Sequence, residues 1–132
     1  HNCKPNIVYR AVTESELRSI LSGNGIARGA GRTTPTQHVG GVRHSQNPWV
    51  STTRSFESAV FFSTHGGTRP PGAIIAIDLN KVANPVLDLS TKDLASSLGL
   101  PWARNMAAAH QEVLIHGGIN IEAIVSFVAT GM

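Results

Sequence analysis

Cysteine is nearly absent from this chain of 132 residues, in which Cys3 is the only one. A disulfide within the chain is therefore excluded, as is a zinc or iron–sulfur site built on several thiolates. Long apolar runs are also missing, because each is far shorter than the roughly 18 residues of a membrane-spanning helix. These absences exclude disulfide scaffolds and helical membrane proteins, and they leave apolar burial to stabilise a single domain.

The sequence also lacks runs of like charge. The formal net charge is 11 − 8 = +3, to which residues 1–70 contribute 8 − 3 = +5 and residues 71–132 contribute 3 − 5 = −2. The basic first half can attract an anionic ligand, but its arginines stand singly and do not form the run that is typical of a nucleic-acid surface.

A secretory leader is not visible, and the chain starts at His1 rather than at methionine. We therefore expect a domain processed from a larger protein. Residues 1–132 are interpreted as that single domain, with residues 1–6 as a loose extension at its N-terminus.

The first element that the sequence predicts is a strand over 7–12, rich in β-branched and aromatic residues. Thr13 and Glu16 follow with the spacing of a capping box, so a helix should begin there and end at Gly23. Its apolar residues Leu17, Ile20 and Leu21 are expected to be buried.

The remaining chain alternates between short elements and loops. Residues 23–48 are rich in glycine and lack apolar periodicity, which indicates a long functional loop. Further strands are expected at 49–53, 73–79, 86–89, 112–115 and 121–129, with 73–79 central in a sheet. One helix is expected from 56 to about 66. A second helix should be capped by Ser90, run to about Leu98 and be ended by Gly99 and Pro101. A short helix or loop is expected at 106–109. The pattern predicts an α+β fold with two small sheets packed face to face.

One carboxylate stands out because it opens an otherwise apolar strand. Glu112 would be costly to bury there unless it is hydrogen-bonded or used in chemistry. Candidate partners on other strands are Arg10 and the hydroxyl run from Ser51 to Thr53.

Three ordered blocks of the sequence resemble the mono-ADP-ribosyltransferase toxins of the cholera and pertussis group, the Arg-Ser-Glu class. Tyr-Arg-Ala at 9–11 is similar to the first block, Val-Arg-His at 42–44 with Trp-Val-Ser-Thr-Thr at 49–53 to the second, and Gln-Glu-Val at 111–113 with Gly-Gly-Ile at 117–119 to the third. The resemblance runs from about residue 8 to residue 127. It implies an ADP-ribosyltransferase-like fold in which flanking helices and two sheets surround an NAD⁺ cleft.

The resemblance also implies roles for single residues. Arg10 would offer its planar fork of donors to an NAD⁺ phosphate, nearby ribose hydroxyls or backbone, and Ser51 would hold the rotamer of Glu112. Glu112 would stabilise the positive charge that develops as nicotinamide leaves the ribose. The further residues expected to bind NAD⁺ are Ala11, His38, Thr52 and Phe61, although sequence alone does not separate Phe61 from Phe62.

The sequence departs from the arginine-modifying members two positions before the catalytic glutamate, where they carry a second glutamate and this chain has His110. Strand alternation would place His110 on the same side as Glu112, facing the acceptor. A histidine cannot bind a guanidinium bidentately as a carboxylate does. The acceptor, whether a protein side chain, a nucleic-acid group or water, therefore stays open.

Three functions are compatible with these residues. The first is an NAD⁺-dependent mono-ADP-ribosyltransferase toxin acting on a macromolecule, in the first place a protein, in the cytoplasm of a target bacterial cell. The second is an NAD⁺ glycohydrolase that depletes NAD⁺, and the third is a non-catalytic module that binds nucleic acid or an acidic protein. No metal is expected, because the histidines lack a ligand spacing such as His-Glu-x-x-His.

The resemblance extends to the biological setting. It implies a toxin domain at the C-terminus of a secreted or injected Rhs-type polymorphic effector used in competition between bacteria. Cells that make such effectors typically carry an immunity protein, so a tight partner that plugs the cleft is expected.

Overall fold

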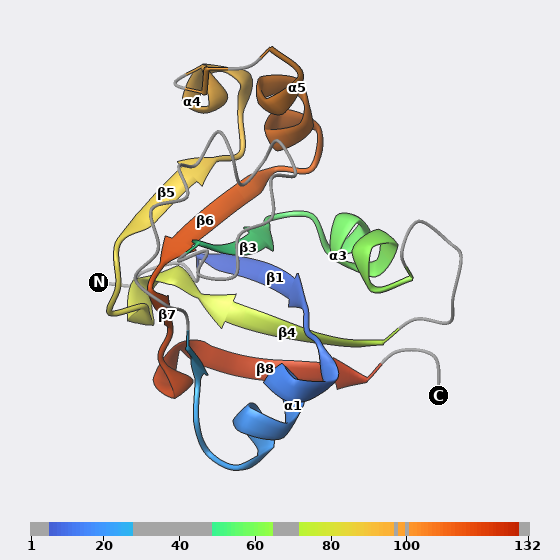
Figure 1. The fold of residues 1–132 in the computed structure, drawn as a ribbon, viewed down its shortest axis with the longest axis vertical. Helices are drawn as coiled ribbons and strands as arrows, with labels where there is room; N and C mark the ends of the chain where they lie inside the picture. The colour runs from blue at the N-terminus through green and yellow to red at the C-terminus, as the bar shows by residue number, and fades with distance from the viewer. Residues whose placement is uncertain (1–5, 28–48, 65–71, 97, 100, 130–132) are drawn as a thin grey trace.

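The computed structural model describes residues 6–27, 49–64, 72–96, 98–99 and 101–129. Strands and helices alternate along these segments, with α4 and α5 at one end of the molecule and α1 at the opposite end (Figure 1). The strands are β1 (Ile7–Ala11), β2 (Ile26–Ala27), β3 (Trp49–Thr53), β4 (Ala73–Asp78), β5 (Val86–Leu89), β6 (Glu112–His116), β7 (Gly118–Ile119) and β8 (Ile124–Ala129). The helices are α1 (Glu14–Leu21), α3 (Phe56–Ser63), α4 (Lys92–Ala95) and α5 (Pro101–Ala109), with 3₁₀ turns η1 (Leu79–Lys81) and η2 (Ile121–Ala123).

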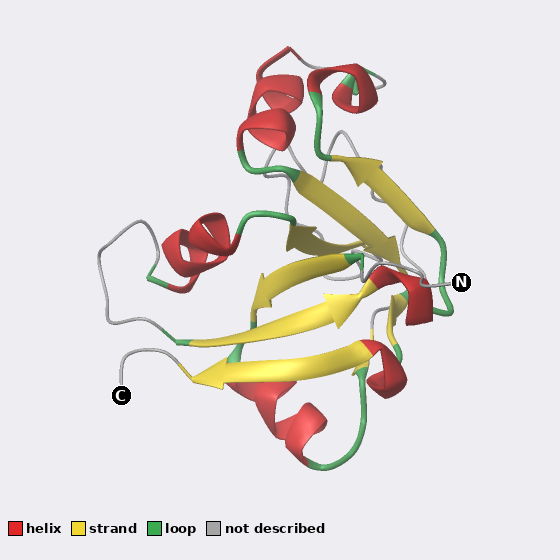
Figure 2. Cartoon of the chain, turned by 180° about the vertical axis from the view of Figure 1, so that it is seen from behind, coloured by secondary structure: helices red, strands yellow, loops and turns green. Residues whose placement is uncertain are grey.

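The strands form two antiparallel sheets of unequal size, as the view from behind also shows (Figure 2). Six strands lie in the order β5-β6-β3-β1-β4-β8, and β2 pairs with β7. The small sheet packs on the large one, because Ile26 and Ile119 share an apolar cluster with Val8 and Val50. The expected α+β class with two packed sheets is thus confirmed.

The large sheet divides in its middle. β1 pairs with β4 at five positions, and β3 pairs with β6 at five positions. β1 and β3, however, pair only at Tyr9 and Thr53. The sheet therefore consists of two three-stranded halves, β5-β6-β3 and β1-β4-β8, that meet at one register pair. We call this meeting point of β1 and β3 the junction.

Most of the buried apolar residues of the described chain form two clusters. One lies between the six-stranded and the two-stranded sheets, and the other lies between α4, α5 and strands β5 and β6.

Within the described residues, no helix is long and apolar enough to cross a membrane. The strand expected at 73–79 forms β4. It lies between β1 and β8 in the interior of the sheet, which explains why most of its residues are buried.

The capping box at the start of α1 forms as expected. The Thr13 side chain accepts from the backbone N–H of Glu16, and the Glu16 carboxylate accepts from the backbone N–H of Thr13. Ile20 is half-buried, but Leu21 is 70% exposed, so its expected burial is wrong. The inward face of this short helix is centred on Glu16 and Ile20, and the next residue is turned about 100° away from it.

The helical region from 90 to 109 differs from expectation. Thr91, not Ser90, caps α4, and the helix ends at Ala95 rather than at Leu98. Pro101 begins α5 instead of ending a helix, which agrees with the preference of proline for the first helical position, where no N–H partner is lost.

Strand β2 lies within the stretch expected to be loop. A Cβ on Gly25 would lie 1.9 Å from the carbonyl oxygen of Ile119, so only glycine lets the chain enter β2 this close to β7. This short strand depends on a contact far along the sequence, which local periodicity does not reveal.

Candidate active site

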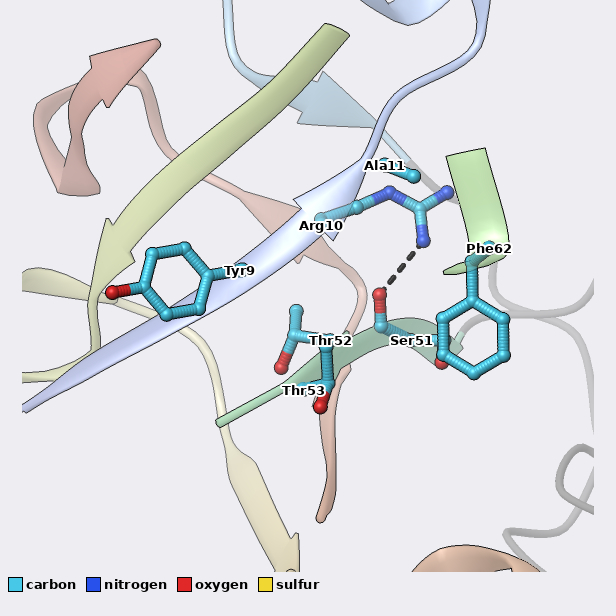
Figure 3. A pocket seen from close by; sticks show the side chains of 7 residues that line it. All are labelled: Tyr9, Arg10, Ala11, Ser51, Thr52, Thr53 and Phe62. Carbon is cyan, nitrogen blue, oxygen red and sulfur yellow. Dashed lines mark hydrogen bonds between the residues drawn. The ribbon is translucent and has the colours of Figure 1, made fainter. Parts of the chain in front are cut away.

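A pocket of about 220 Å³ lies at the junction. Its walls come from β1, β3 and α3 (Figure 3). The lining residues are Tyr9, Arg10, Ala11, Ser51, Thr52, Thr53 and Phe62. Of the residues that the sequence nominated, Arg10, Ala11, Ser51 and Thr52 thus lie together at this pocket.

Arg10 bridges the two halves of the sheet. Its side chain is 12% exposed, and its Nη1 donates to the carbonyl oxygen of Ser51 at 2.8 Å, the bond drawn in Figure 3. The rest of the guanidinium faces Glu16, with Nη2 2.8 Å from Oε2 and Nε 3.3 Å from Oε1. Arg10 thus contacts backbone, and its planar fork is directed at a carboxylate of α1, which sequence reasoning missed.

Glu112 opens β6 and is held by Ser51 on the neighbouring strand. Register pairs Glu112 with Thr53, and Ser51 lies two residues from Thr53 on the same face of β3. The Ser51 hydroxyl donates to Oε1 of Glu112 at 2.5 Å. The partner that sequence reasoning required for this carboxylate is therefore present.

Burial controls the acidity of Glu112. Its desolvation raises the pKa to about 7, and the bond from Ser51 and the positive charge of Arg10 oppose this shift without cancelling it. A carboxyl with such a pKa exchanges its proton near neutral pH, and as a carboxylate it can stabilise positive charge in a site shielded from water.

The two threonines that follow Ser51 fix the beginning of β6. Thr52 donates through Oγ1 to the carbonyl oxygen of Val113 at 2.7 Å, and Thr53 donates to the carbonyl oxygen of His110. Both threonines are buried. Their hydroxyls therefore hold the backbone on either side of Glu112, which limits the positions that its carboxylate can take.

Helix α3 brings two aromatic rings to the site. Ser55 caps the helix by accepting from the backbone N–H of Ser58. Phe62 lines the pocket, whereas Phe61, the residue chosen from the sequence, is not among its lining residues and contacts Phe62 and His110. Both phenylalanines fit a helix that follows a strand, so no sequence signal separated them.

His110 does not continue the strand that begins at Glu112. It follows α5, and Gln111 between them has a positive φ of 49°. The expected strand alternation is therefore wrong, because His110 and Gln111 lie in a turn in which Gln111 has a left-handed conformation. The His110 ring instead packs against Phe62 with ring centroids 4.9 Å apart, and its Nδ1 lies 3.4 Å from Oγ of Ser58. His38 lies outside the described residues.

Solved structures with a similar fold were found in a comparison. EcPltA has 15% identity and a TM-score of 0.69, over 96% of this chain and 77% of that chain. A protein named guanine-specific ADP-ribosyltransferase has 16% identity and a TM-score of 0.62, over 98% and 69%. The Scabin toxin from Streptomyces scabies, solved in complex with NADH, has 18% identity and a TM-score of 0.60, over 97% and 66%.

These similarities confirm the ADP-ribosyltransferase-like fold that the sequence led us to expect. A comparison with curated proteins gave no match. A family model described as a domain of unknown function, DUF7587, matches residues 32–131, a segment that contains Ser51 and Glu112 but begins after Arg10 and Glu16. With most of its length matched, the chain belongs to the DUF7587 family.

Proposed function

We propose that residues 1–132 form the catalytic domain of an NAD⁺-dependent mono-ADP-ribosyltransferase, which transfers ADP-ribose from NAD⁺ to a macromolecule and releases nicotinamide. The observation that carries this proposal is the bond to the buried Glu112 from Ser51, which lines the pocket together with Arg10, whereas Glu112 itself is not among the lining residues. The name of one similar structure and the NADH in another support the same chemistry.

The pocket fits the reacting end of NAD⁺. Its volume of about 220 Å³ suits a ring-sized group rather than a whole dinucleotide. Phe62 offers aromatic surface to a planar ring, and the second N–H of Arg10 Nη1 can donate to a ribose or phosphate oxygen. Ala11 and Thr52 line the same pocket, and we propose that they, His38 and Phe61 also contribute to NAD⁺ binding.

Glu112 is proposed as the catalytic residue. As a carboxylate it has one oxygen bound by Ser51 and a second with which to accept from a ribose hydroxyl. It stabilises the positive charge that develops on the ribose as the glycosidic bond breaks and its electron pair leaves with nicotinamide. The acceptor then forms the new bond to the ribose carbon, and its proton passes to Glu112 or to water.

The acceptor that we propose is a protein in the cytoplasm of a target bacterial cell. Delivery as part of a larger secreted or injected Rhs-type effector, and inhibition by an immunity protein that covers the pocket, belong to the same proposal. The similarity to a structure named a toxin supports this setting. A guanine base is a competing acceptor, because one similar structure is named guanine-specific.

His110 favours a second candidate, the NAD⁺ glycohydrolase. The residue two positions before Glu112 is a histidine whose ring packs on Phe61 and Phe62 and approaches Ser58. Because His110 has no carboxylate with which to bind the guanidinium of an acceptor, water can take the place of a macromolecular acceptor.

Incubating the domain with NAD⁺ in bacterial lysate tests the proposal. Radiolabel in the ADP-ribose part and measured nicotinamide release would be compared for the wild type, Glu112→Gln and the control Glu122→Gln, which alters an exposed carboxylate. We expect a labelled protein with the wild type and the control, and none with Glu112→Gln.

The other outcomes separate the alternatives. Label on nucleic acid would replace the protein acceptor, and rapid nicotinamide release without label would identify the glycohydrolase. No NAD⁺ turnover by a folded wild type, in bacterial or eukaryotic extract, would contradict the enzyme and favour the binding module.

A further inference from the structure

Glu16 is a buried carboxylate that the proposed reaction does not use. It is 7% exposed and lies in the first turn of α1, not on the strands that carry Ser51 and Glu112. Its two oxygens face the Arg10 guanidinium, with Nη2 2.8 Å from Oε2 and 3.1 Å from Oε1, and Nε 3.3 Å from Oε1. Two guanidinium nitrogens are thus bound by one carboxylate.

The capping box alone does not account for this geometry. Its bond to the backbone N–H of Thr13 uses Oε1 of Glu16 at 3.1 Å, and a glutamine side chain can make the same bond. A second acidic residue of the helix shows the contrast, since Glu14 pairs with Arg18 while both are largely exposed, at 80% and 74%. Exposed pairs of that kind contribute little, whereas Glu16 is buried against an arginine of the pocket.

The contacts continue from Glu16 to the proposed reaction centre. Arg10 Nη1 donates to the carbonyl oxygen of Ser51 at 2.8 Å, and the hydroxyl of the same serine donates to Glu112 at 2.5 Å. An arginine whose Nε and Nη2 are bound has little rotational freedom left, so its Nη1 is aimed at β3 before any ligand arrives. Because this long side chain loses its conformational entropy during folding, that entropic cost does not reduce the affinity for a ligand.

We infer that Glu16 is a positioning residue, which holds the Arg10 guanidinium across the junction in a fixed position relative to Ser51 and Glu112. This role deepens the proposed function and rests on it for its effect on rate. Glu16 is not among the residues that line the pocket, and it acts on the site through Arg10.

A double-mutant cycle tests whether Glu16 acts through Arg10. The variants are Glu16→Gln, Arg10→Gln and the double variant, and nicotinamide release from NAD⁺ is measured for each. Thr13→Ala is the matched control, because it removes the hydroxyl that accepts from the Glu16 backbone but leaves the ion pair in place. Glu16→Gln alone leaves the buried charge of Arg10 unpaired, which can unfold the protein. The double variant removes both charges of the pair and serves as a check on this effect.

We expect Glu16→Gln to lower kcat/KM at least tenfold, and the double variant to be no worse than Arg10→Gln within twofold. Thr13→Ala should lower the melting temperature and leave kcat/KM within twofold of the wild type. Losses that multiply in the double variant, or equal losses for Glu16→Gln and Thr13→Ala, would overturn the inference in favour of a capping role.

A readout without NAD⁺ separates this inference from the proposed function. The ¹⁵N resonance of the Arg10 Nε–H group should report a restricted side chain in the wild type and in Thr13→Ala, and a mobile one in Glu16→Gln. If the wild type does not turn over NAD⁺ but this pattern holds, the proposed function fails and the positioning of Arg10 stands. An Arg10 side chain that stays equally restricted in Glu16→Gln would overturn it whatever the activity.

Discussion

The two halves of the large sheet and the junction between them are built by different interactions. Within the halves, β1 matches β4 and β3 matches β6 at five positions each, with buried pairs such as Val8 opposite Ile77. At the junction, one register pair remains, and the side-chain bond from Arg10 of β1 to the backbone carbonyl of Ser51 on β3 connects the two halves.

The difference shows how a sheet can contain a polar pocket. Continuous backbone pairing satisfies N–H and C=O groups and leaves apolar side chains to fill the core. Where β1 and β3 diverge, the backbone N–H and C=O groups of the two strands no longer pair with each other. Polar side chains can then face the space between the strands. Stability therefore resides mainly in the halves, and the proposed chemistry resides at the junction.

Changing the core of a half should produce the largest loss of stability. Ile77 of β4 is fully buried in the cluster between the sheets, and Ile77→Ala should lower the free energy of unfolding by about 2–5 kcal/mol. Denaturant unfolding measures this loss, and nicotinamide release per folded molecule should stay unchanged. The control Val125→Ala alters an exposed residue of β8 and should change stability by less than about 0.5 kcal/mol. A loss of activity in Ile77→Ala without a loss of stability would contradict the separation.

Removing the carboxyl at the junction should affect stability in a manner that depends on pH. The pKa of Glu112 is about 7 in the folded protein against 4.5 ordinarily. Between these values the unfolded chain loses the proton that the folded chain keeps, so the wild type loses stability as pH rises, by about 3 kcal/mol in total. Above pH 7 the carboxyl is ionised in both states, and the loss is complete.

Glu112→Gln lacks this titration and should therefore gain about 3 kcal/mol relative to the wild type between pH 4 and pH 8. Denaturant unfolding at both pH values measures the gain. The exposed control Glu122→Gln should follow the wild type at both. A constant difference between Glu112→Gln and the wild type would show that Glu112 titrates normally in the folded protein.

Removing the hydroxyl that holds Glu112 should have the smallest effect. Ser51→Ala eliminates a hydrogen bond to a charged group, worth about 1.5–3 kcal/mol, so nicotinamide release at pH 7 should fall about ten- to a hundredfold. Since that bond lowers the pKa of Glu112, the midpoint of the pH–rate profile should move upward and the deficit should shrink at high pH. Ser96→Ala, on the exposed end of α4, is the control. A deficit equal at all pH values would mean that Ser51 does not act on the acidity of Glu112.

Local patterns predicted the elements that depend on local interactions. The spacing of Thr13 and Glu16 gave the start of α1, and the apolar run at 73–79 gave an interior strand. The meeting of Ser51 with Glu112 was expected because ordered motifs resembled a known family and because a buried carboxylate needs a partner.

Features set by distant contacts or by single backbone angles were not predictable in this way. Strand β2 exists because Gly25 lets it approach β7, and His110 leaves the strand because Gln111 adopts a positive φ. The pairing of Glu16 with Arg10 depends on the angle at which α1 leaves β1. A six-residue separation of opposite charges is too common to indicate a buried pair.

The pH–rate profile of nicotinamide release from NAD⁺ tests most directly whether the junction is a reaction centre controlled by Glu112. For the wild type, kcat/KM should rise tenfold per pH unit below a midpoint near pH 7 and level off above it, following the pKa of about 7. Glu112→Gln should be slower by about two to three orders of magnitude and show no such rise. A wild-type profile that is flat from pH 5 to pH 9, or a Glu112→Gln variant that keeps the wild-type rate, would contradict the account.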